Sequence, residues 1–152
     1  MVRVRTKRDA LAPGEFFAGV RKGLKATLPE DLRRFEVGRG HSRLLKIHYG
    51  RPEVHFEAWH HTGDGRLEVG LHFEGTAPFN DSAFAYFRAR MVEVKALLPR
   101  AELEPWDRGW SRLYETLPAP VLDERAQDAA REKMGAYIAA LQPMVTSFLE
   151  DK

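Results

Sequence analysis

The sequence predicts an α+β fold, in which an antiparallel sheet of about five strands has helices packed on one face. Three observations lead to this class. Alternating apolar and polar residues fill two separate stretches, an apolar stripe of helical spacing precedes each of them, and a longer stripe ends the chain. The expected order of elements is therefore α-β-β-β-α-β-β-α, with a long C-terminal helix. The alternative is a helix-grip arrangement, in which that helix crosses a strongly curved sheet and closes a cavity.

The first helix is expected over residues 13–28, where large apolar residues recur at spacings of three and four. The proline at position 29 ends it, or restarts the chain as a short helical turn through residue 35. A strand follows over residues 43–49, where apolar and polar residues alternate. The turn signal at 50–52 should then bring the next strand back beside this one.

The central hairpin carries the tripeptide His-Phe-Glu twice, at 55–57 and at 72–74. Between the two copies lies Asp64-Gly65, a dipeptide that favours a type I′ turn because both central residues need a positive φ. That turn fixes the register of the two strands. The cross-strand pairs that it predicts are Gly63 with Arg66, His61 with Glu68, Trp59 with Gly70, Glu57 with His72, and His55 with Glu74.

The second half of the chain should add a helix, a hairpin and the long last helix. Asn80 is expected to cap the middle helix, which then runs to the residue before Pro99. The next hairpin turns through residues 107–109, with Gly where a left-handed conformation is needed. Its predicted pairs are Glu102 with Tyr114, Glu104 with Arg112, and Trp106 with Trp110. The last helix should run from Asp123 towards Leu149.

Composition excludes several classes of protein. The net charge of +2 is small for a nucleic-acid-binding protein, although basic residues crowd the first eight positions. No apolar run approaches the roughly 20 residues that span a bilayer, so we expect no membrane association. The absence of cysteine excludes disulfides and thiolate ligands and is consistent with a cytoplasmic location. We expect a basic N-terminal arm over residues 1–12 and one domain over 13–152.

The candidate metal ligands are His55, Glu57, His72 and Glu74. Residues two apart on a strand point to the same side, so the predicted hairpin gathers two imidazoles and two carboxylates on one face. Such a set can bind a divalent ion such as zinc, manganese or iron. The alternative needs no cofactor: the same residues form a ladder of His–Glu pairs on a solvated sheet face, each worth roughly 0.2–1 kcal/mol.

Aromatic and charged residues should extend this face across both hairpins. Aromatic side chains with Arg on an otherwise polar surface are typical of interfaces and of pockets for small polar ligands. The alternative is that the C-terminal helix folds over this face and buries it as a second core layer. The predicted binding face consists of Trp59, His61, Glu68, Trp110, Arg112 and Tyr114.

These features predict a function only in outline. The first hypothesis is a non-enzymatic binding or interaction module, cytoplasmic and homodimeric, that uses the His/Glu/Trp-rich face. The second is a metal-dependent enzyme of the hydrolase or isomerase type, with the two-His, two-Glu site on the same face. A lower alternative is nucleic-acid binding through the basic arm, whose affinity would fall steeply with salt.

Overall fold

The computed structural model describes residues 9–151. Its helices are α1 (Pro13–Thr27), α2 (Ala77–Arg88), α3 (Met91–Leu97) and α4 (Glu124–Glu150), with the short 3₁₀ helices η2 (Glu30–Leu32) and η3 (Asp107–Gly109). Its strands are β1 (Glu36–Val37), β2 (Leu44–His48), β3 (Val54–His61), β4 (Arg66–Phe73), β5 (Glu102–Pro105) and β6 (Ser111–Pro118). The basic residues at positions 3, 5, 7 and 8 of the predicted arm lie outside the described residues.

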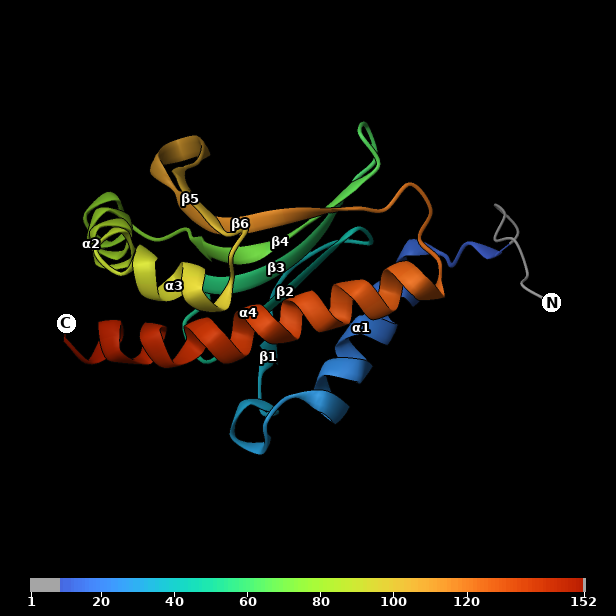
Figure 1. Ribbon diagram of the computed structural model, residues 1–152, viewed down its shortest axis with the longest axis horizontal. Coiled ribbons are helices and arrows are strands. Elements are labelled where there is room, and N and C mark those ends of the chain that lie inside the picture. The colour runs from blue at the N-terminus through green and yellow to red at the C-terminus, as the bar shows by residue number, and fades with distance from the viewer. Residues whose placement is uncertain (1–8, 152) are drawn as a thin grey trace.

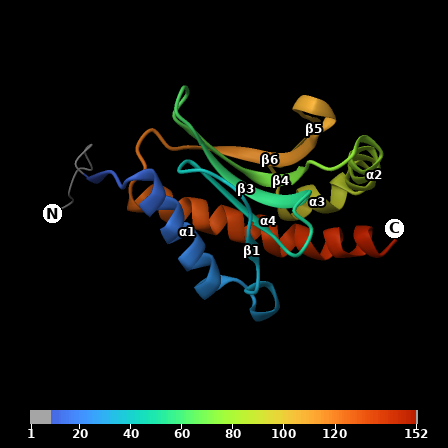
Figure 2. The same cartoon turned by 180° about the vertical axis from the view of Figure 1, so that it is seen from behind.

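The strands of residues 9–151 form one antiparallel sheet of six strands in the order β1-β2-β3-β4-β6-β5. α1 and α4 lie against one face, and the loop end of the β5–β6 hairpin rises above the other (Figures 1 and 2). The α+β class and the long C-terminal helix are confirmed, with six strands instead of about five. The additional strand is β1, where Glu36 and Val37 pair with β2. Two residues are too few to show the alternation that predicts a strand.

The core lies between the sheet and the helices. Phe56 of β3 and Phe73 of β4 point towards the helices and are buried, as are Met134, Tyr137 and Leu141 of α4. Because a strand alternates its side chains, His55 and Glu57 of β3 and His72 of β4 must point to the opposite face, whereas His60 shares the face of Phe56. No helix among residues 9–151 is long and apolar enough to cross a membrane.

The predicted middle helix is two helices, α2 and α3. α2 begins at Ala77, earlier than predicted, because Pro78 suits the first turn of a helix, where its missing N–H costs nothing. Asn80 is therefore not a cap. Its buried side chain accepts a hydrogen bond from the Gly75 N–H and donates to the carbonyl oxygens of Gly75 and Gly109, which ties α2 to the loop of the β5–β6 hairpin.

The register predicted for the β3–β4 hairpin is wrong by two residues. His61 pairs with Arg66, so the loop has four residues instead of two, and His55 lies opposite His72. The Asp64 carboxylate accepts a hydrogen bond from the Arg66 N–H, and Gly65 is the only residue of this loop with a positive φ. A type I′ turn needs two such residues. Because the shift is even, every side chain stays on its predicted face while its partner changes.

The register predicted for the second hairpin is confirmed. Glu102 lies opposite Tyr114 and Glu104 opposite Arg112, and the Trp106 N–H donates to the Trp110 carbonyl oxygen. In the three-residue loop Arg108 and Gly109 have φ values of 61° and 76°. This hairpin therefore carries both of its tryptophans to the side of the sheet away from the helices.

Candidate metal centre

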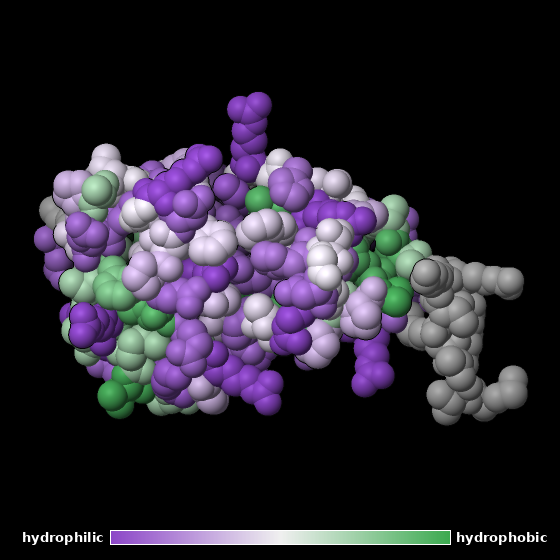
Figure 3. Space-filling view, turned by 90° about the horizontal axis from the view of Figure 1, so that it is seen from above, coloured by the Kyte–Doolittle hydropathy of each residue, from purple (hydrophilic) through white to green (hydrophobic). Residues whose placement is uncertain are grey.

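The candidate site lies on the face of the sheet turned away from α1 and α4, which we call the polar face. β3 places His55, Glu57 and Trp59 there, because alternate residues of a strand point to one side. β4 adds Glu68 and His72 on the same principle. Hydrophilic residues predominate on the surface seen from this side (Figure 3).

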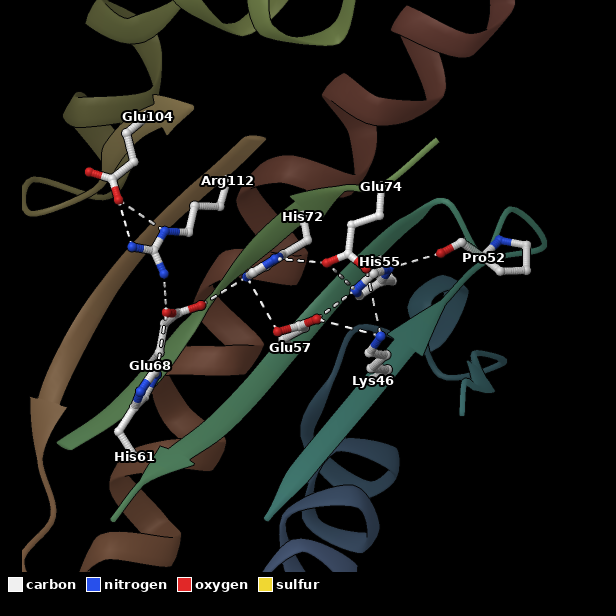
Figure 4. A network of polar contacts seen from close by, with 10 residues as sticks. All are labelled: Lys46, Pro52, His55, Glu57, His61, Glu68, His72, Glu74, Glu104 and Arg112. Atoms are coloured by element: carbon white, nitrogen blue, oxygen red, sulfur yellow. Dashed lines mark hydrogen bonds and ion pairs between the residues drawn. The ribbon is translucent and has the colours of Figure 1, made fainter. Parts of the chain in front are cut away.

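The structure brings the four predicted metal ligands together. His55, Glu57, His72 and Glu74, which we call the quartet, each offer one ligand atom, and these atoms lie within 4.8 Å of one another. Ligands held at about 2.0–2.2 Å from a tetrahedral ion are about 3.4 Å apart. The quartet can therefore close around an ion through small side-chain movements. Figure 4 shows its side chains converging from β3 and β4.

Three residues of the quartet are buried and Glu74 is partly exposed, so the predicted solvated ladder is wrong for this part of the face. His55, Glu57 and His72 are 2%, 3% and 1% exposed. A buried ionisable group needs a partner, because its charge costs far more away from water. The chemistry of the site therefore depends on which partner each nitrogen and oxygen has.

The hydrogen bonds of His55 favour a cation between the quartet residues. Its Nδ1 lies 2.8 Å from the Pro52 carbonyl oxygen, which can only accept, so Nδ1 carries a proton. Its Nε2 lies 2.8 Å from Glu57 Oε1 and 3.7 Å from Glu74 Oε2. In a neutral ring Nε2 would carry a lone pair, which would face the carboxylate oxygens without a hydrogen between them. Either a second proton or a metal ion must therefore lie between Nε2 and the carboxylates. Histidines that bind a metal ion usually donate the N–H of their other ring nitrogen to a carbonyl or carboxylate oxygen, as His55 does here.

His72 has carboxylates on both ring nitrogens. Nδ1 lies 3.2 Å from Glu74 Oε2, while Nε2 lies 2.9 Å from Glu68 Oε2 and 3.4 Å from Glu57 Oε2. Burial disfavours the charged ring, but the hydrogen bonds to Glu68 and Glu74 and the charge of Glu57 outweigh it and raise the pKa of His72 to about 9. The surroundings of this ring are therefore built for a positive charge.

Arg112 holds Glu68 in place behind His72. Its guanidinium donates to Glu68 Oε1 and to Glu104 Oε1, and it lies 3.8 Å from the ring centroid of Trp106 and 3.9 Å from that of Tyr114. Burial alone would raise the pKa of Glu68, but the hydrogen bond from His72 and the charge of Arg112 lower it below its usual value. Glu68 thus stays an anion that can orient His72 from outside the quartet. The guanidinium itself is fully engaged within the fold.

Lys46 completes the site, although the sequence did not single it out. It lies on β2 directly opposite Glu57. Its Nζ is 3.8 Å from Glu57 Oε1 and 3.7 Å from Glu74 Oε1. The alternation of residues 43–49 already placed Lys46 on the polar side of its strand, but its partner depends on the length of the connection between β2 and β3, which is longer than the predicted turn at 50–52.

A hollow of about 270 Å³ adjoins the quartet on the polar face. Glu57 and Glu74 line it together with Lys46. All three tryptophans of the chain also line it: Trp59, Trp106 and Trp110. The alternative in which the C-terminal helix buries this face is wrong, since α4 packs on the other side of the sheet. Trp106 was left out of the predicted binding face, although its predicted pairing with Trp110 already placed it on that side.

The other residues of the predicted binding face lie beside the quartet. Trp59 packs against His61, with ring centroids 4.0 Å apart, and His61 Nε2 lies 3.5 Å from Glu68 Oε1. Tyr114 donates a hydrogen bond to Glu104 Oε1. These residues link the tryptophan-lined hollow to the Glu68–Arg112 pair. They support the site from its edge and lie outside the set of candidate ligands.

The donor set determines what the site can do chemically. Four carboxyl groups share two fixed cations, Lys46 and Arg112, so a divalent ion would supply positive charge where the network has most carboxylate. Imidazole and carboxylate ligands suit zinc, iron and manganese. An ion that faces a hollow can polarise a carbonyl group or lower the pKa of a bound water. The network carboxylates are Glu57, Glu68, Glu74 and Glu104.

The function of this site has to be inferred from its residues and their contacts alone. Comparison with protein-family models, with curated protein sequences and with solved structures found no match.

Proposed function

We propose that the protein binds one divalent transition-metal ion through the quartet and uses it to hold a small ligand in the adjoining hollow. The bound ion would act as a Lewis acid on that ligand or on a water molecule, which is the chemistry of a hydrolase- or isomerase-type enzyme. The support comes from two imidazoles and two carboxylates of residues 9–151 whose ligand atoms lie within 4.8 Å of one another.

A single observation carries this proposal beyond a generic charged cluster. His55 commits its Nδ1 proton to the Pro52 carbonyl and turns Nε2 towards Glu57 and Glu74. This is the arrangement in which a histidine is held ready as a ligand, with its outer nitrogen hydrogen-bonded and its inner nitrogen aimed at the ion. Glu68 performs the matching role for His72 if that ring binds the ion through Nδ1.

Metal binding is tested on protein purified without an affinity tag. We expect elemental analysis to find about one equivalent of zinc, manganese or iron, and we expect added zinc or manganese to stabilise metal-stripped protein. An ion at 100 times its Kd stabilises by about 2.7 kcal/mol. For a chain of this length that corresponds to roughly 5–10 °C in Tm. The proposal would be contradicted if the purified protein held no metal and its Tm did not change when zinc or manganese was added.

A second candidate function is that of a non-enzymatic interaction module, in which the polar face contacts another copy of this chain. It is favoured by the three tryptophans, which remain partly exposed around the hollow. Partly exposed aromatic residues are the commonest anchors of protein interfaces. A cytoplasmic homodimer of this kind predicts sedimentation that depends on concentration, and a Trp110→Ser variant that sediments as a monomer. A wild-type chain that sediments as a monomer at high concentration would contradict this candidate.

A further inference from the structure

Two hollows meet at the edge of the quartet. One, of about 270 Å³, holds the three tryptophans, and the other, of about 250 Å³, is lined by Arg39, His48 and His55 among others. Lys46 and Glu74 line both. Any small molecule that reached the quartet through either hollow would therefore pass Lys46.

The walls of the larger hollow favour a planar ligand. Each tryptophan already has a cationic or imidazole neighbour: His61 at 4.0 Å from Trp59, Arg112 at 3.8 Å from Trp106, and Arg108 at 5.5 Å from Trp110. The close contacts of His61 and Arg112 restrict the rings of Trp59 and Trp106, whereas the Arg108 side chain is mostly exposed. Large aromatic walls gain most from a flat, apolar partner. The hollow is smaller than the roughly 300–1,000 Å³ typical of sites for drug-sized ligands, so the ligand should be small.

The charges around the hollow favour an anion once an ion is bound. In the protein alone, the carboxylates of Glu57 and Glu74 outnumber the Lys46 ammonium. The other two charged residues that line the hollow, Asp107 and Arg108, lie 3.9 Å apart and offset each other. A divalent ion would draw on the same two carboxylates, which leaves the Lys46 ammonium under-compensated. The side chain of Lys46 is 23% exposed, so its Nζ can still contact a ligand.

We infer that the hollow binds a small aromatic carboxylate, and this inference rests on the proposed metal site. Its carboxylate oxygens contact the ion and Lys46 Nζ, and its ring lies among Trp59, Trp106 and Trp110. Charge-assisted hydrogen bonds of this kind are among the stronger polar contacts, and the aromatic walls add selectivity for a flat ring. Lys46 is then the residue that selects for negative charge.

Benzoate is the probe for the test, and tryptophan fluorescence is the readout. The three tryptophans of the chain all line this hollow, so the signal reports on no other part of the protein. We expect benzoate to change the fluorescence of zinc-loaded protein in a saturable way and to leave metal-free protein unchanged. Cyclohexanecarboxylate, with the same charge and no flat ring, should bind more weakly. Benzyltrimethylammonium, with a flat ring and the opposite charge, should not bind.

The variant Lys46→Met separates the ligand site from the metal site. Measured at saturating zinc, with the metal content checked by elemental analysis, it should weaken benzoate binding roughly 10- to 100-fold. The matched control is Lys22→Met, which changes an exposed lysine of α1 on the other side of the sheet and should leave benzoate binding unchanged.

The outcomes distinguish this inference from the proposal on which it rests. Zinc binding without any response to benzoate overturns the inference and leaves the metal site standing. A chain that binds no zinc overturns both. Equal benzoate binding with and without zinc, or preferential binding of benzyltrimethylammonium, also overturns the inference, because the site then selects for something other than an anion on a metal ion.

Discussion

Replacing His72 with glutamine is expected to weaken zinc binding by roughly 100-fold. Structural zinc sites bind with about 10–16 kcal/mol, which is about 3 kcal/mol for each of four ligands. A loss of that size corresponds to about two orders of magnitude in Kd. Glutamine can still donate a hydrogen bond towards Glu68, so the buried carboxylates keep a partner and the fold is preserved. The measurement is calorimetric titration of metal-stripped protein with zinc.

The matched control is His61→Gln. His61 lies on the same face of the sheet, at the end of β3, and its Nε2 is 3.5 Å from Glu68 Oε1, yet it lies outside the quartet. This variant should bind zinc as tightly as the unchanged chain. If both variants lost the same amount of zinc affinity, zinc binding would depend on the overall charge of the face and not on the ligands of the quartet. His55→Gln should lose affinity as His72→Gln does.

The pH dependence of the same titration provides a second readout. The pKa of His72 is raised to about 9, so a metal ion that binds one of its nitrogens must displace a proton at neutral pH. Zinc affinity should therefore rise with pH up to about 9, and His72→Gln should remove this part of the dependence. In the metal-free protein the sign is opposite. The stability that the protonated ring contributes is complete below about pH 6.5 and is lost as the pH rises through about 9.

Replacing Gly70 with alanine is expected to destabilise the protein by roughly 3 kcal/mol. Gly70 lies in the middle of the sheet, opposite Glu57 on one side and Tyr114 on the other. A Cβ atom there would lie 2.4 Å from the Leu113 carbonyl oxygen and 2.6 Å from the Tyr114 Cα. These are backbone atoms of a paired strand and cannot turn aside, so β4 and β6 would have to move apart.

The test is urea-induced unfolding, with Gly135→Ala as the control. Gly135 lies inside α4, and a Cβ atom there would meet Leu24 Cδ2 at 3.7 Å, an ordinary contact. Alanine in a helix interior is more favourable than glycine by up to about 1 kcal/mol, so this variant should be neutral or more stable. An unfolding midpoint for Gly70→Ala equal to that of the unchanged chain would contradict the prediction. Since Gly70 separates Glu68 from His72 along β4, the variant should also weaken zinc binding.

The faces of the central strands could be predicted from the sequence alone. Strict alternation assigned Phe56 and Phe73 to the core and His55 and His72 to the opposite side. This assignment holds even though the predicted register was wrong, because a shift of two residues keeps each side chain on its face. The alternation of side chains along a strand is a local property, so the face of each residue can be predicted without knowing which strand lies beside it.

The partners within the site could not be predicted in the same way. The loop of the β3–β4 hairpin has four residues because Asp64 bonds the Arg66 N–H, and this placed His55 opposite His72. The starting point of α2 depends on Pro78, and Asn80 then joins α2 to the second hairpin. The length of the loop and the start of the helix depend on competing hydrogen bonds of similar strength, and the sequence alone does not show which of them form.

By itself, the sequence determined the class of the fold, the face of each strand and the gathering of two His and two Glu on one side. Only the tertiary structure decided that this side is buried around the quartet and that Lys46 and the three tryptophans enclose one hollow beside it. The physical reason is that side-chain direction follows from the local backbone. Burial depends on which distant segments bring side chains over a face, and here those are β2, with Lys46, and the loop of the β5–β6 hairpin, with Trp106 and Trp110.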